Sequence, residues 1–149
     1  MINFYLDIET IPCQSPEYRE KTRAGIKPPG NIKKPESIMQ WIEENADSAA
    51  DEAVAKTSFD PAHGHICCIG FAIDDGKPQY YEARTLADER AMLECFFSNM
   101  PEIGLVRFVG HNVSGFDLRF IICRAIVLGV RIPPIFPRDI KPWSQEIFD

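Results

Sequence analysis

The stretch Asn3-Phe4-Tyr5-Leu6-Asp7-Ile8-Glu9-Thr10 alternates between apolar and polar side chains. A period of two is typical of a β-strand with two unlike faces. The apolar residues would face a core, and Asp7 and Glu9 would lie side by side on the other face. Two carboxylates this close are costly to hold unless a proton or a cation neutralises them, and hard oxygen ligands suit Mg²⁺ or Mn²⁺. A solvated polar face is the alternative, and an isolated Asp-x-Glu would favour it.

A second stretch, from Leu105 to Asp117, combines an apolar strand with a short polar loop. Ser114 is expected to open an apolar helix over 118–128, with Gly129 as its stop. Asp117 would then lie in the first helical turn, just beyond the end of a strand. Ser114-x-x-Asp117 is also a capping box, and an acid there suits the helix dipole. Local sequence therefore leaves both capping and catalysis open for Asp117.

Between these stretches, the sequence predicts a helical insertion and then a return to the sheet. Prolines and charges dominate the insertion, and its clearest helix carries an apolar stripe of Ile38, Met39, Trp41 and Ile42. The next strand is apolar throughout, which predicts burial on both of its faces. A hairpin strand and a helix capped by Thr85 and Asp88 follow. The expected ranges are 12–61 for the insertion, 36–55 for its helix, 66–73 and 79–83 for the strands.

Composition restricts the class of protein. A chain of 149 residues predicts one domain, and its net charge of −6 argues against broad binding to a nucleic-acid backbone. An enzyme that grips one strand end through metal ions remains compatible with that charge. No apolar run approaches the roughly 20 residues of a membrane span, and the N-terminal sequence lacks the features of a signal peptide. We therefore expect a cytoplasmic protein with no membrane partner. The five cysteines contain no C-x-x-C pair, which favours reduced, buried thiols.

Taken together, Leu6-Asp7-Ile8-Glu9-Thr10 and Gly110-His111-Asn112-Val113-Ser114-Gly115-Phe116-Asp117 resemble two motifs of the DEDD family of 3′–5′ exonucleases. The nearest subgroup is similar to the proofreading domain of family B DNA polymerases, with its small phage and prophage relatives. Residues 56–61, leading into 66–72, also look like this subgroup. The resemblance covers essentially the whole chain, 1–149. It implies an α/β, ribonuclease H-like fold, in which a mixed sheet is flanked by helices.

The resemblance also implies a reaction, which is two-metal hydrolysis of the terminal phosphodiester at the 3′ end of single-stranded DNA or RNA. Asp7, Glu9 and Asp117 would be the catalytic metal ligands for two Mg²⁺ or Mn²⁺ ions, with Asp7 bridging both. The terminal nucleotide would meet main-chain groups at Thr10 and Ile11. Three further residues would line its pocket, namely His111, Asn112 and Phe116, although Phe116 fits a core position better.

The sequence departs from the family in its third motif, Y-x-x-x-D or H-x-x-x-D, which supplies a fourth acid. No tyrosine or histidine follows Asp117, and the residues four positions before Asp139 and Asp149 are Ile135 and Gln145. The terminal 146–149 segment resembles the strand that normally precedes the catalytic helix carrying this motif. We therefore expect a fold without that C-terminal helix.

Three functional interpretations follow from the missing motif. One is a truncated exonuclease with weak or no activity. The second is a catalytically inactive module that binds nucleic acid or a protein partner. The third is an active short form whose site is completed by another subunit or by an unexpected ligand. Without the covering helix, we expect Trp143, Ile147 and Phe148 to be exposed at a C-terminal edge, where the chain could self-associate or bind a partner.

Overall fold

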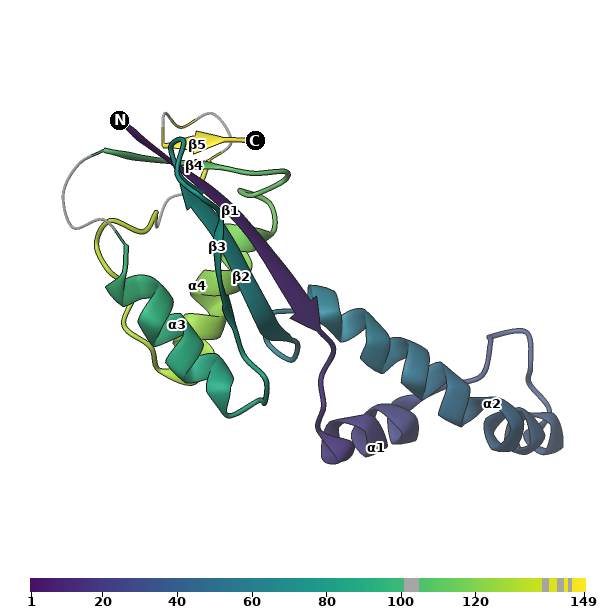
Figure 1. Ribbon diagram of the computed structural model, residues 1–149. Coiled ribbons are helices and arrows are strands. Elements are labelled where there is room, and N and C mark those ends of the chain that lie inside the picture. The colour runs from purple at the N-terminus through teal and green to yellow at the C-terminus, as the bar shows by residue number, and fades with distance from the viewer. Residues whose placement is uncertain (101–104, 138–139, 142–143, 145) are drawn as a thin grey trace. The chain divides into compact units, whose positions relative to one another are not determined.

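The computed structural model describes residues 1–100, 105–137, 140–141, 144 and 146–149. The chain divides into two compact units. The sheet unit combines Met1–Ile11 with His65–Asp149, and the helical unit is Pro12–Gly64. Figure 1 shows the elements of each unit. Each unit is described separately below.

The sheet unit is built on five strands in the order β3-β2-β1-β4-β5. β1 pairs antiparallel with β2, and β2 antiparallel with β3. β4 and β5 run parallel to β1, so the sheet is mixed. β1 lies in the centre and is the longest strand, which agrees with the prediction from its alternating sequence. The bounds are β1 Ile2–Ile11, β2 His65–Ile73, β3 Gln79–Glu82, β4 Val106–Val109 and β5 Ile147–Phe148.

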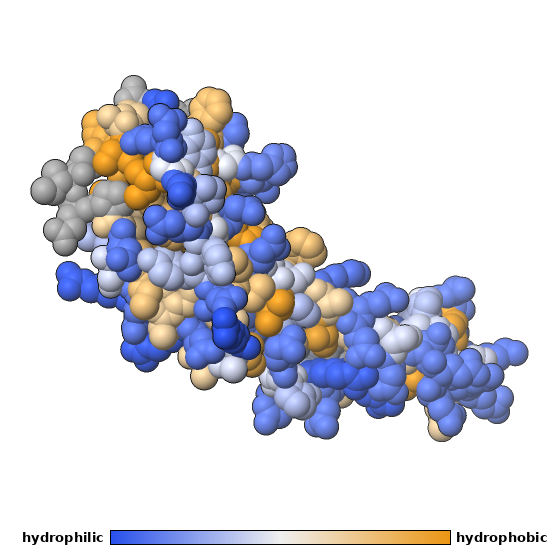
Figure 2. All heavy atoms as spheres, viewed as in Figure 1, coloured by the Kyte–Doolittle hydropathy of each residue, from blue (hydrophilic) through white to orange (hydrophobic). Residues whose placement is uncertain are grey.

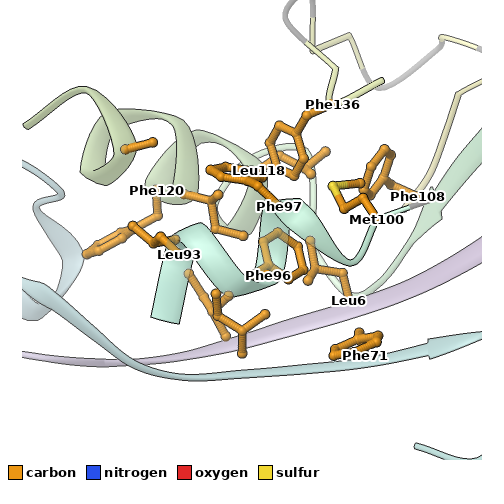
Figure 3. Close-up of a cluster of buried hydrophobic side chains, with 14 of the residues drawn as sticks. Leu6, Phe71, Leu93, Phe96, Phe97, Met100, Phe108, Leu118, Phe120 and Phe136 are labelled. Carbon is orange, nitrogen blue, oxygen red and sulfur yellow. The ribbon is translucent and has the colours of Figure 1, made fainter. Parts of the chain in front are cut away.

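Two helices, α3 (Asp88–Ser98) and α4 (Asp117–Leu128), lie on the same side of this sheet (Figure 1). The core forms between them and the apolar face of β1, where Phe4 and Leu6 are buried. Phe4 stacks on Phe71 of β2 with ring centroids 5.5 Å apart, and Phe96 of α3 meets both rings edge-on. Figure 3 shows Leu6, Phe71 and Phe96 within this cluster. The burial of one face of β1 leaves its Asp7 and Glu9 face exposed.

The sequence predicts that β2 is buried on both faces, but α3 and α4 both cover the same face of the sheet. Ile69 and Phe71 are buried, whereas Cys67 and Cys68 on the strand are only half-buried. The expectation of burial on both faces is therefore wrong. None of the five cysteines is fully buried, although partial burial raises the pKa of both the Cys67 and Cys68 thiols.

The sequence predicts the C-terminal end of α4 correctly and its N-terminal cap incorrectly. Its C-terminus is at Gly129, which adopts the left-handed conformation with φ 66°, as the sequence predicts. Its N-terminus is not capped by Ser114, because the helix begins at Asp117 and Phe116 occupies the cap position without a side-chain hydrogen bond. The prediction of a Ser114 cap is wrong, and Ser114 has a different partner described below.

A buried ion pair joins α3, α4 and β2. Glu89 and Arg124 are 1% and 3% exposed, and two bonds connect them, Nε to Oε1 at 2.8 Å and Nη2 to Oε2 at 2.7 Å. Glu89 also accepts the Ile66 N–H at 2.9 Å and lies 3.1 Å from Nδ1 of His65. Burial alone would raise the pKa of Glu89, but the hydrogen bonds from Arg124 and Ile66 outweigh it and lower that pKa. The pair is therefore held ionised inside the fold.

The helical unit contains α1 (Pro16–Gly25), α2 (Pro35–Ala55) and a 3₁₀ turn at Lys56–Phe59. The predicted helix at 36–55 is confirmed, but α1 is an addition to the prediction. Arg19 and Arg23 of α1 form exposed ion pairs with Asp47 and Asp51 of α2. Met39, expected in the apolar stripe, is 71% exposed, and small residues of α2 are buried instead. Among the described residues, no helix is long and apolar enough to cross a membrane.

Candidate active site

The site begins where β4 stops and β1 continues. The last residue pair between these strands is Tyr5 with Val109, so the edge of β1 beyond Tyr5 is open to the chain that leaves β4. That chain, Gly110–Phe116, is called here the motif loop. A Cβ at Gly110 would lie 2.6 Å from the carbonyl oxygen of Leu6, so only glycine allows this close approach to β1.

A tight turn inside the motif loop brings the chain into α4. Asn112 adopts a left-handed conformation with φ 53°, and its carbonyl oxygen accepts the N–H groups of Gly115 at 3.1 Å and Phe116 at 2.9 Å. The side chain of Asn112 occupies the space next to Gly115 that a larger residue would need. Asparagine tolerates this conformation better than most residues do. The turn therefore sets where α4 starts.

Asp117, the first residue of α4, is attached directly to β1. Its Oδ1 accepts the backbone N–H of Ile8 at 2.9 Å, and the residue is 3% exposed. Ile8 is the residue between Asp7 and Glu9, so the two motif stretches meet at this bond. The pKa of Asp117 is raised to about 6, mainly by burial and in addition by the nearby charges of Asp7 and Asp149, while backbone hydrogen bonds oppose the rise. Asp117 is thus a buried acid next to other acids.

Asp7 and Glu9 are both exposed on the same face of β1. Asp7 lies close enough to Asp117 for its charge to act on that residue. Among the described residues, however, no three His, Cys, Asp or Glu side chains are placed to hold a metal ion. The structure therefore brings Asp7 and Asp117 together, whereas Glu9 does not complete a group of three with them. The oxygen donors of the pair fit Mg²⁺ or Mn²⁺ chemically, and a cation would relieve the repulsion between them.

One acid near the site was not among the predicted site residues. Asp149 follows β5 directly, and its carboxylate accepts hydrogen bonds from the backbone N–H of Ser114, at 3.1 Å, and from Oγ of Ser114. Burial alone would raise the pKa of Asp149. Hydrogen bonds from Ser114 and from the Val113 N–H outweigh burial, and the charge of His111 acts in the same direction, so the pKa of Asp149 is lowered. Its position in the sequence could have indicated a place near the site, because Asp149 follows a strand that runs parallel to the strand leading to Asp117.

The predicted nucleotide-contacting residues lie around the same edge. Thr10 and Ile11 are half-buried at the end of β1, just after a register shift between Glu9 and Thr10. His111 and Asn112 are exposed on the motif loop. Phe116 is half-buried with its ring 5.3 Å from that of Phe120, and it packs against the core. This position agrees with the core alternative for Phe116.

The C-terminal edge differs in part from expectation. Phe148 is 62% exposed, as predicted, but Ile147 is 5% exposed because β5 pairs with β4 and turns this residue into the core. The expectation of an exposed Ile147 is therefore wrong. Trp143 and Asp139 lie outside the described residues. On the visible face, apolar surface gathers near the end of the sheet unit that carries β4 and β5 (Figure 2).

Comparisons with known proteins agree with this architecture. A model of the family described as DNA polymerase family B, exonuclease domain, matches residues 34–140, a range that contains Asp117 but starts after Asp7 and Glu9. Among solved structures, a family B DNA polymerase from the hyperthermophilic archaeon Pyrobaculum calidifontis is similar, with a TM-score of 0.50 and 20% identity. The match covers 91% of this chain and 12% of the polymerase. A search of curated proteins found no match.

The fold is an α/β, ribonuclease H-like fold with a mixed five-stranded sheet and flanking helices, as the sequence predicts. The family match spans more than half of the chain. The chain belongs to the exonuclease domain family of family B DNA polymerases.

Proposed function

We propose that this chain is a 3′–5′ exonuclease module that hydrolyses the terminal phosphodiester at the 3′ end of single-stranded DNA or RNA, using divalent metal ions. The observation that carries the proposal is the bond from Ile8 N–H to Oδ1 of Asp117, at 2.9 Å. This bond sets a buried acid of α4 beside the Asp-x-Glu of β1. Carboxylates from separate elements that meet at one place are what a metal-dependent phosphodiesterase needs.

Asp7, Glu9 and Asp117 are the proposed ligands for Mg²⁺ or Mn²⁺, two ions in the full mechanism. Bound ions would supply an activated water and stabilise the charge on the leaving 3′ oxygen. Asp117 must be ionised to bind a cation, and its burial and the charge of Asp7 oppose that ionisation. Cation binding and loss of the Asp117 proton are therefore coupled in this proposal.

The remaining predicted residues would hold the nucleotide. Main-chain groups of Thr10 and Ile11 would contact the terminal nucleotide, and His111, Asn112 and Phe116 would approach it from the motif loop. Because the net charge is −6, electrostatic contact with many phosphates along the nucleic-acid backbone is unfavourable. Binding of one strand end through metal ions fits that charge better than binding along a duplex.

Slow hydrolysis is expected from these 149 residues alone. The sequence contains no Y-x-x-x-D or H-x-x-x-D after Asp117, so it offers no such tyrosine or histidine to align the water. Loss of a group that positions or deprotonates the nucleophile typically costs roughly 10²–10⁴ in rate. Weak binding of Mn²⁺ by the remaining acids would lower the rate further.

A nuclease assay tests the proposal. A 5′-labelled single-stranded oligonucleotide is incubated with Mn²⁺ and the wild-type chain, with Asp7→Ala, or with Asp75→Ala as a matched control in the exposed β2–β3 turn. We expect slow shortening from the 3′ end by the wild type and the control, and none by Asp7→Ala. Equal shortening by all three proteins would contradict the proposal.

A module that binds without catalysis is the second candidate. It is favoured by one observation, the lack of a three-ligand group among the described residues. Its binding would use a single-stranded nucleic acid or a protein partner, the latter at the exposed Phe148 edge. In that case, fluorescence anisotropy would detect oligonucleotide binding that is independent of Mn²⁺ and unaffected by Asp7→Ala, with no shortening in the nuclease assay.

A further inference from the structure

We propose that Asp149 is a positioning residue, which fixes the motif loop through Ser114 and so keeps Asp117 on β1. This role goes beyond the three proposed metal ligands, and its relevance to catalysis rests on the proposed function. The contact of Asp149 with Ser114, called here the clamp, is a property of the metal-free fold. It can therefore be tested without any activity.

The end of β5 holds the motif loop at two points. The carbonyl oxygen of Phe148 accepts the N–H of Gly110 at 3.2 Å, at the start of the loop. The carboxylate of Asp149 accepts both donors of Ser114, the N–H at Oδ1 and the hydroxyl at Oδ2. Hydrogen bonds to an ionised carboxylate are among the stronger ones in proteins. The loop is therefore fixed to β5 at both its beginning and its later part.

Ser114 connects this clamp to the first turn of α4. Its carbonyl oxygen accepts Nε of Arg119 at 3.0 Å, and the neighbouring Val113 carbonyl accepts the N–H of Leu118 at 3.0 Å. Ser114 is 3% exposed, so its hydroxyl has little access to water as a substitute partner. A loop that is released from Asp149 would let the start of α4 shift, and Asp117 with it.

The same contacts give Asp149 a role that requires no metal ion. Each of its two side-chain oxygens already accepts a hydrogen bond from Ser114. The second lone pair of each oxygen stays available, so the variants described below separate a ligand role from a positioning role. The clamp role uses the geometry as it stands.

Amide hydrogen exchange of the metal-free chain, followed by NMR, tests the clamp. The reporter is the N–H of Ile8, which is protected only while Asp117 is in place. The internal reference is the N–H of Ile66, which bonds to Glu89 away from the loop. In Asp149→Ala, we expect Ile8 exchange to accelerate about tenfold relative to Ile66, because loss of a charge-assisted bond loosens the loop locally.

Two further variants separate the alternatives. Ser114→Ala removes only the hydroxyl bond and should accelerate Ile8 exchange by a smaller factor, which keeps the test available if Asp149→Ala does not fold. Asp149→Asn keeps an acceptor for the Ser114 N–H without the charge, so it should retain most of the Ile8 protection and of the Mn²⁺ affinity. If Asp149→Asn loses Mn²⁺ affinity while Ile8 stays protected, Asp149 is a ligand and the proposal is overturned.

Unchanged Ile8 exchange in both Asp149→Ala and Ser114→Ala would also overturn the clamp. This outcome is distinguishable from failure of the proposed function. If the exchange results are as expected but the wild type neither binds Mn²⁺ nor shortens oligonucleotides, the clamp stands and the exonuclease proposal fails.

Discussion

Asp117 accepts the backbone N–H of Ile8 at 2.9 Å, although the two residues lie 109 positions apart in the chain. The bond places a buried carboxylate at the residue that separates Asp7 from Glu9. It joins the central strand of the sheet to the start of α4. Both the stability of the metal-free chain and the proposed chemistry should depend on this contact.

The first prediction concerns the pH dependence of stability in the absence of metal. The pKa of Asp117 is raised from an ordinary 3.8 to about 6, so the folded state favours its protonated form. The stability that this protonation contributes is present below about pH 4 and is lost as pH rises through about 6. The asparagine of Asp117→Asn is uncharged at every pH, so this variant should keep that stability as the pH rises. At pH 7 its free energy of unfolding should exceed that of the wild type by up to roughly 3 kcal/mol.

Urea denaturation of both proteins at a series of pH values measures this difference. The gap in the free energy of unfolding should open between about pH 4 and pH 7. Two curves that stay parallel over this range would show that the Asp117 carboxyl is not perturbed by its surroundings.

The second prediction concerns the buried pair of Glu89 and Arg124. Glu89→Gln leaves the Arg124 charge buried without its partner, which typically costs about 3–5 kcal/mol of stability. Because the pKa of Glu89 is lowered in the fold, its contribution is present above about pH 4.5 and is lost as pH falls through the folded pKa. Chemical denaturation at neutral pH gives the cost, and exposed Glu94→Gln on the same helix is the control. Equal stability of the two variants would mean that the pair does not hold α3 against α4.

The third prediction concerns the close approach of the motif loop to β1. Gly110→Ala would place a methyl group 2.6 Å from the Leu6 carbonyl oxygen, so the loop must move away. Overpacking of this kind typically costs roughly 1–3 kcal/mol. Gly70→Ala, on the neighbouring strand, is the control, because its nearest atom would be the Asp7 carbonyl oxygen at 3.8 Å. Thermal unfolding should show a lower Tm for Gly110→Ala only.

The sequence was most informative where a local pattern determines the structure. The alternation around Asp7 predicted β1 and its two faces, because the period of two follows from strand geometry. Gly129 predicted the end of α4 because few other residues tolerate its left-handed conformation. The two motif stretches also predicted that Asp7 and Asp117 belong together, although the structure does not gather Glu9 into a group of three with them.

Contacts between distant parts of the chain leave no local pattern in the sequence. Ser114 matches a helix cap locally, but in the fold its hydroxyl bonds to Asp149, which lies 35 positions further along the chain. The pair of Glu89 and Arg124 is likewise separated by 35 positions, and neither residue has a local pattern that reveals its partner. The α1 helix escaped prediction for another reason. None of its residues is buried, and its sequence accordingly shows no apolar periodicity that would predict a helix.

The central claim is that Asp7 and Asp117 share a divalent cation, and titration with Mn²⁺ followed by electron paramagnetic resonance tests it most directly. The free Mn²⁺ signal is measured against the wild type, Asp7→Ala, Asp117→Asn and the exposed control Asp75→Asn. We expect weak Mn²⁺ binding by the wild type and the control, and a loss of affinity of at least about tenfold in each of the other two variants. Mn²⁺ binding of equal strength by all four proteins would contradict the central claim.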